Sequence, residues 1–89
     1  MKSLVFAPSF KKAFKNATQR KPELVPIITE TLKLLAENPF NPQLRSHKLK
    51  GRLAGSWSCT VTYDCRIIFS FEKNNEILLM DVGSHDDVY

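Results

Sequence analysis

The spacing of apolar residues changes once along this chain of 89 residues, and that change limits the folds available to it. Between residues 10 and 35, apolar residues recur every three or four positions, which is typical of amphipathic helices. From Trp57 onward apolar and polar residues alternate, which is typical of strands with one buried face. A helical segment followed by strands predicts an α+β domain, with a helical hairpin packed on a small antiparallel sheet.

Two helices joined by a short turn are expected in the first half. The first begins at Ser9, whose hydroxyl is suited to cap a helix, and runs to about Thr18. The second begins near Pro22 and ends at Asn38, because Pro39 disfavours a helical residue before it. The short connection favours an antiparallel hairpin. Its buried side chains are expected to be Phe10, Ala13, Phe14, Ala17, Leu24, Ile27, Ile28, Thr31, Leu34 and Leu35.

Strands account for the other regular structure. The apolar run Ser3–Phe6 predicts a first strand, and residues 38–46 are expected to form a loop. Three later strands, at residues 57–63, 65–72 and 77–82, are separated by short turns and predict an antiparallel meander. If the face towards the helices carries Trp57, Val61, Ile67 and Phe69, the opposite face is polar. That polar face is where a site is expected, and it carries Ser58, Thr60, Thr62 and Arg66.

Positive charge is concentrated in two segments. The net charge is +4, from 13 basic and 9 acidic residues. Six basic residues fall in Met1–Lys21 and four in Arg45–Arg52, and neither segment has an acidic residue. Such segments favour a polyanionic partner such as nucleic acid, with a solvated, solubilising surface as the alternative. The length fits a single domain over residues 1–89.

Several function classes lack the residues that they need. No apolar run approaches the roughly 20 residues of a membrane span, and we expect a cytoplasmic protein with no signal peptide and no membrane partner. No glycine-rich phosphate loop is present to bind a nucleotide cofactor. Cys59 and Cys65 are expected to be unreactive core thiols. Asp86 and Asp87 beside His85 are the only nearby carboxylates for a metal, and because adjacent residues point in different directions we expect no metal and no cofactor.

RNA cleavage is a reaction that the polar residues could carry without a metal. The 2′-hydroxyl of the substrate is the nucleophile, so the protein needs only a base, an acid and positive charge at the phosphate. The chain has two histidines, and an isolated histidine is more often a surface or packing residue. The residues that match the three roles are His47 or Asp64 as base, His85 as acid, and Arg66 with Lys48, Lys50 or Arg52 as cations.

Three segments of the sequence resemble the RelE superfamily of bacterial toxins, most closely its YafQ branch. They occur in the family order and on the expected elements, within a resemblance that covers nearly the whole chain. The middle one is also similar to the corresponding strand of YoeB and RelE. The segments are His47–Trp57 with its Gly-Ser-Trp ending, Cys65–Phe69 with its arginine before three apolar residues, and Gly83–Tyr89 with an aromatic four residues after its histidine.

This resemblance implies a RelE-like fold and an endoribonuclease of a type II toxin–antitoxin module that cuts mRNA in the ribosomal A site without a metal. It implies mRNA, ribosomal RNA and a cognate antitoxin as partners. Lys11, Lys12, Lys48, Lys50 and Arg52 are the expected RNA contacts. The implied catalytic set is His47, the acidic Asp64, the transition-state arginine Arg66, the general acid His85 and the closing aromatic Tyr89.

The sequence departs from the YafQ pattern at two positions. Thr60 stands where the family has a further histidine, and Cys65 stands where it has a tryptophan. The choice of base between His47 and Asp64 therefore stays open. Two alternatives share the fold: a ParE-like toxin that binds gyrase without cutting RNA, and an inactive member that only binds its antitoxin. Neither alternative needs both histidines and Arg66.

Overall fold

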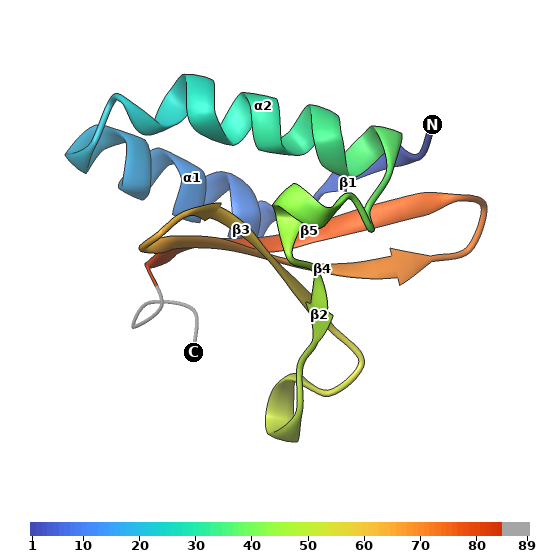
Figure 1. Cartoon of the computed structure of the whole chain (residues 1–89). Helices are drawn as coiled ribbons and strands as arrows, with labels where there is room; N and C mark the ends of the chain where they lie inside the picture. Colours follow the sequence, from blue (N-terminus) through green and yellow to red (C-terminus); the bar gives the residue numbers. More distant parts are fainter. Residues whose placement is uncertain (85–89) are drawn as a thin grey trace.

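Two helices cover one face of a five-stranded sheet in the computed structural model, which describes residues 1–84 (Figure 1). The predicted α+β class is confirmed. The helices are α1 (Pro8–Arg20) and α2 (Leu24–Glu37), and the short 3-10 helices are η1 (Pro42–Leu44) and η2 (Gly51–Leu53). The strands are β1 (Ser3–Phe6), β2 (His47–Lys48), β3 (Trp57–Thr62), β4 (Cys65–Glu72) and β5 (Glu76–Ser84).

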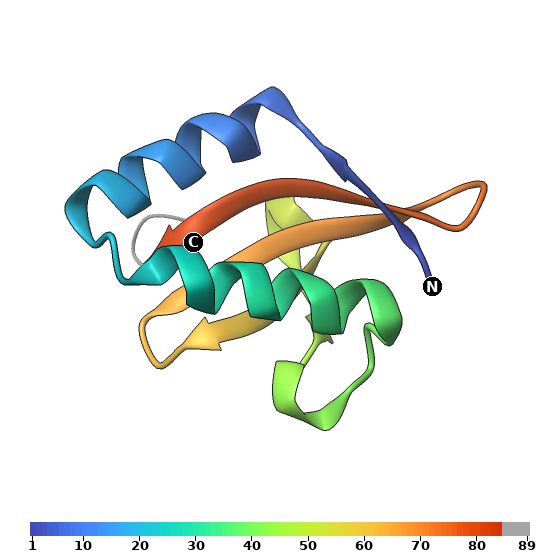
Figure 2. The same ribbon diagram turned by 90° about the horizontal axis from the view of Figure 1, so that it is seen from above.

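The helical hairpin is confirmed, with one error at its start. Helix α1 begins at Pro8, and the preceding residue, Ala7, makes no side-chain cap. The prediction that Ser9 caps the helix is wrong, because proline already occupies the first helical position and needs no N–H partner there. Ser9 instead donates its hydroxyl to the Met80 carbonyl at 2.6 Å, which ties α1 to β5. Helix α2 runs back across the sheet and ends beside Asn38, as predicted (Figure 2).

The sheet has the strand order β1-β5-β4-β3-β2. The predicted meander is confirmed, because β3, β4 and β5 pair antiparallel in sequence order. The first strand joins the far edge and pairs parallel with β5, with Leu4 opposite Ile77, so the complete sheet is mixed. The opposite edge is β2, a strand of two residues that was not predicted. The loop predicted at residues 38–46 contains η1.

One core fills the space between the helices and the sheet. Phe10 of α1 and Ile28 of α2 pack with Ile67 and Phe69 of β4, and each of these side chains is at most 2% exposed. Ile27 was expected in this buried face but is 39% exposed, because it lies about 100° around α2 from Ile28. In the described part of the chain, no helix has the length and apolar character needed to cross a membrane.

The sheet face away from the helices is less open than the alternation indicated. The chain between β2 and β3 folds over this face (Figure 1), and Ser56 makes a 3.7 Å contact with the sulfur of Met80. Ser58 and Ile68 on this face are at most 3% exposed. The expectation that Ser58 belongs to an open polar surface is therefore wrong. Thr60 and Arg66 are partly exposed on this face. The expectation that Thr62 shares this face is wrong, because a register shift after Thr60 places Thr62 opposite Cys65, a core residue.

Candidate active site

Strand pairing brings His47 and Arg66 to the same face of the sheet. His47 lies opposite Ser58 in the β2–β3 pair, and Arg66 lies opposite Thr60 in the β3–β4 pair. Opposite residues of an antiparallel pair share a face, and so do residues two apart on one strand. The strand spacing places the Cα atoms of His47 and Arg66 about 12 Å apart, a separation that two long side chains and a phosphate can span.

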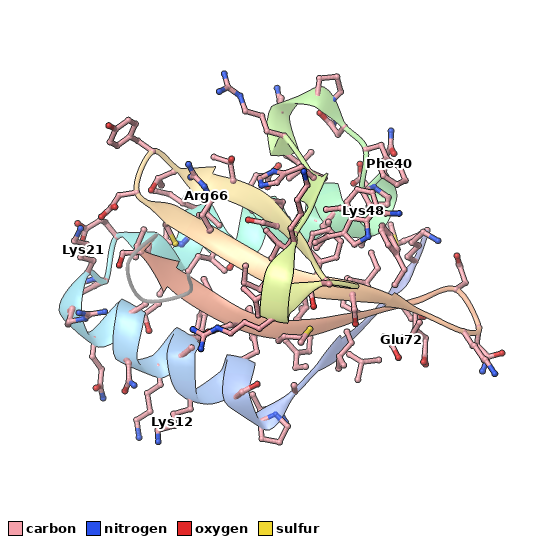
Figure 3. All side chains as sticks on the ribbon, turned by 90° about the horizontal axis from the view of Figure 1, so that it is seen from below. Lys12, Lys21, Phe40, Lys48, Arg66 and Glu72 are labelled. Carbon is pink, nitrogen blue, oxygen red and sulfur yellow. The ribbon has the colours of Figure 1, made fainter. Side chains whose placement is uncertain are left out.

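Arg66 is held towards the turn between β3 and β4. Its Nη1 donates to the Thr62 carbonyl at 2.7 Å and to the Cys65 carbonyl at 3.3 Å. A register shift between Thr60 and Thr62 lets the backbone carbonyl of Thr62 meet the guanidinium. A guanidinium carries five donors, so an arginine anchored through Nη1 can present another nitrogen to a phosphate. Figure 3 looks onto this face and labels Arg66.

The ring of His47 is oriented by a backbone carbonyl. Its Nδ1 lies 3.1 Å from the carbonyl oxygen of Arg45, a residue in the left-handed region with a φ of 51°. A carbonyl can only accept a hydrogen bond, so this contact requires the proton on Nδ1. The neutral ring then carries its lone pair on Nε2, which is the nitrogen that can accept a proton. The His47 side chain is exposed.

Asp64 occupies a different environment. It is exposed in the β3–β4 turn, and it lines a pocket of about 380 Å³ with Arg20 and Lys21 from the end of the helical hairpin. No sequence motif assigned Arg20 or Lys21 to a site, although both belong to the first basic segment. The pocket is also lined by Ala17, Leu24, Thr62, Cys65, Gly83 and Ser84.

His85 and Tyr89 lie outside the described residues. The last described residue, Ser84, is paired with Cys65, and Gly83 lies opposite Arg66. Strand β5 therefore carries the chain to the side of Arg66 immediately before His85 in the sequence. The assignments of His85 and Tyr89 stay predictions.

The expected RNA contacts fall into two separate groups. Lys11 and Lys12 are on α1, whereas Lys48 is on β2, and Lys50 and Arg52 adjoin or lie within η2. Figure 3 shows Lys12 and Lys48 at opposite sides of the molecule. Lys11 and Lys12 on α1 therefore do not share a surface with Lys48. Among residues 1–84, no cluster of three or more histidine, cysteine or acidic side chains is placed to hold a metal ion.

Both cysteines are buried, as the alternation predicts. Burial raises the pKa of the Cys59 thiol from 9.0 to about 12, despite a backbone hydrogen bond at Ile67 that lowers it. Burial also raises the pKa of Cys65, and the negative charge of Asp64 adds to the effect. A thiol that stays protonated is a poor nucleophile and a poor metal ligand.

Because the pKa of Cys59 is raised, the stability of the fold is expected to vary with pH in the alkaline range. Above its ordinary value of 9.0 the unfolded chain releases the thiol proton, whereas the folded chain keeps it up to about pH 12. Because the unfolded state then binds fewer protons, the free energy of unfolding falls as the pH rises above 9, by up to about 1.4 kcal/mol per unit. Denaturant unfolding between pH 7 and 11 measures this slope. We expect Cys59→Ala to be less stable than the wild type at pH 7, but its free energy of unfolding should fall less steeply with pH. Equal slopes in the two proteins would contradict the raised pKa of Cys59.

Solved structures of bacterial toxins share this fold. YafQ from E. coli strain BL21(DE3) superposes with a TM-score of 0.83 at 16% identity, covering 100% of this chain and 99% of that one. A metal-bound toxin from Helicobacter pylori gives 0.82 at 25% identity, with 100% of both chains covered. The YoeB–YefM complex from Staphylococcus aureus gives 0.75 at 23% identity, covering 96% of this chain and 98% of the matched one. No curated protein sequence matches the chain.

The fold and the sequence together define a toxin of a type II toxin–antitoxin system. Residues 2–89 match the family model described as the bacterial toxin of type II toxin–antitoxin systems, YafQ. Because the match spans nearly the whole chain, the protein belongs to the YafQ toxin family. The predicted family is thereby confirmed.

Proposed function

We propose that this toxin is a ribosome-dependent, metal-independent endoribonuclease that cleaves mRNA in the A site and thereby inhibits translation. The observation that carries the proposal is the placement of His47 and Arg66 on one sheet face, with the Nδ1 of His47 bound to a carbonyl. A base with a free ring nitrogen and a cation within reach of the same phosphate are two of the three groups that this reaction needs.

In the proposed reaction, Nε2 of His47 takes the proton of a ribose 2′-hydroxyl. The 2′-oxygen attacks the adjacent phosphorus, and Arg66 stabilises the negative charge that develops on the phosphoryl oxygens. The bond to the 5′-oxygen of the next nucleotide breaks as His85 gives that oxygen a proton. The products are a 2′,3′-cyclic phosphate and a 5′-hydroxyl. In this scheme Tyr89 stacks on a base.

The assigned partners follow from the charge of the molecule and from its relatives. Lys50 and Arg52 are proposed to contact RNA phosphates beside the site, and Lys48 to contact them from the other face of β2. Lys11 and Lys12 are proposed to contact ribosomal RNA or the antitoxin from α1. Related toxins have been solved as the E. coli DinJ–YafQ complex and as the S. aureus YoeB–YefM complex. A cognate antitoxin is therefore proposed here too. Action on translated mRNA implies a cytoplasmic location.

Mapping the 5′ ends of mRNA in a cell-free translation reaction tests this function. We expect the wild-type toxin to produce new 5′-hydroxyl ends inside codons only when translation is active. With His85→Ala these ends should fall by roughly a hundredfold, because the leaving oxygen loses its proton donor. Intact mRNA together with gyrase-dependent DNA damage would contradict the proposal and favour the ParE-like alternative.

A further inference from the structure

A cluster of three aromatic rings lies at the end of the sheet away from the β3–β4 turn, and the proposed reaction does not use it. Phe40 stacks on Phe71 with ring centroids 5.7 Å apart and an angle of 26° between the planes. Trp57 meets both rings edge-on, at 5.5 Å from Phe40 and 5.3 Å from Phe71. Phe40 is nevertheless 58% exposed, so the stacked pair presents a ring to solvent.

The exposed position of Phe40 is fixed by its loop. The backbone N–H of Phe40 donates to the side-chain oxygen of Asn38 at 3.0 Å. The N–H of Asn41 donates to the Asn38 carbonyl at 3.0 Å, and the Ser46 hydroxyl donates to the Pro39 carbonyl at 2.6 Å. An aromatic side chain that is held in place loses little conformational entropy when it binds a ligand.

Two ammonium groups border the aromatic cluster. The Nζ of Lys48 lies 5.8 Å from the centroid of the Trp57 ring, and the Nζ of Lys2 lies 5.8 Å from that of Phe71. Lys2 is also held by the side-chain oxygen of Asn75 at 2.9 Å. An exposed ring for a base to stack on, flanked by positive charge for its phosphates, is the combination that binds single-stranded nucleic acid.

The cluster is connected to the candidate active site through the edge strand β2. His47 and Lys48 are adjacent on this strand, so their side chains point to opposite faces of the sheet. Lys48 lies opposite Trp57, on the face of the aromatic cluster, whereas His47 lies on the face of Arg66. In Figure 3, Phe40 and Lys48 lie close together and apart from Arg66. A strand of RNA that crosses the edge at β2 therefore meets both sites.

We propose that Phe40, Lys48 and Lys2 bind an unpaired base of RNA and its flanking phosphates, close in sequence to the linkage that is cleaved. This inference rests on the proposed function. The bordering charges are both positive, which favours a polyanion over an apolar protein segment as the ligand. Phe40 supplies the stacking surface and the two lysines bind the phosphates.

Trp57 is the only tryptophan of the chain, so its fluorescence reports directly on this cluster. The probe is a hexaadenylate with 2′-O-methyl groups, which lacks the nucleophilic hydroxyl and is not cleaved. We expect saturable quenching of Trp57 and binding about tenfold weaker in Phe40→Leu, because leucine preserves apolar packing but cannot stack on a base. Phe40→Tyr should bind as the wild type does. Lys48→Gln should lower the dependence of log affinity on log salt by about 0.7.

Phe6→Leu is the matched control, because Phe6 is a phenylalanine exposed elsewhere, on β1. Unchanged Trp57 fluorescence with the wild type, or unchanged affinity in both Phe40→Leu and Lys48→Gln, would overturn the inference. So would a loss of antitoxin binding in Phe40→Leu with RNA binding intact, because the cluster would then be a protein-docking surface. A failure of the proposed function is distinguishable, since mRNA would stay uncut while hexaadenylate binding still depended on Phe40.

Discussion

Replacement of Arg66 by alanine is expected to lower the rate of mRNA cleavage by roughly a hundredfold or more, or about 2.7 kcal/mol of transition-state stabilisation. The reason is electrostatic. The phosphate gains negative charge in the transition state, and Arg66 is the cation that strand pairing places on the same face as His47. Single-turnover cleavage of programmed ribosomes measures the loss. Arg66→Lys should recover only part of the rate, because an ammonium lacks the forked donors of a guanidinium.

The control for Arg66 has to separate catalysis from folding. Arg66 also donates to the carbonyls of Thr62 and Cys65, so its removal costs the β3–β4 turn about 1 kcal/mol of stability. Thermal unfolding of each variant should therefore show a folded protein at the assay temperature. Lys73→Ala, which removes an exposed positive charge from the β4–β5 turn, is the matched charge control and should cleave at the wild-type rate. Full activity of a folded Arg66→Ala variant would eliminate the proposed role.

Replacement of His47 by glutamine is expected to reduce cleavage by about 10² to 10⁴, the usual contribution of a general base. Glutamine cannot accept the 2′-hydroxyl proton but preserves polarity at an exposed position. Asp64→Asn should change the rate by less than about threefold, because Asp64 lies in the pocket with Arg20 and Lys21 and not on the face that carries His47. The two variants, compared in the same single-turnover assay, decide which residue is the base.

The opposite result would identify Asp64 as the base. A large loss in Asp64→Asn and none in His47→Gln would move the base to the pocket at the end of the helical hairpin. His47 would then be a surface residue bound to the Arg45 carbonyl. Unfolding in denaturant should show both variants to be as stable as the wild type, because both side chains are exposed.

Local sequence signals predicted most of the regular structure. The helices, the meander and the buried faces of Phe10, Ile28 and Phe69 follow from periodicity, which reflects contacts within one turn of helix or along one strand. The errors arose where a distant part of the chain competes with a local preference. Ser9 is a good capping residue, but the carbonyl of Met80 takes its hydroxyl. Ser58 alternates as a surface residue but is fully buried, on the face where the neighbouring segment contacts β5 through Ser56 and Met80.

The sequence by itself determined the class of this protein and the chemical groups that it has available. Histidines, Arg66, basic segments and a family pattern over residues 2–89 are all properties of the chain as written. Only the tertiary structure decided which groups meet. The two-residue strand β2 brings His47 to the face of Arg66 and sends Lys48 to the aromatic cluster, and β1 reaches β5 from the other end of the chain. These pairings depend on long-range burial and hydrogen bonding, which leave little trace in local periodicity.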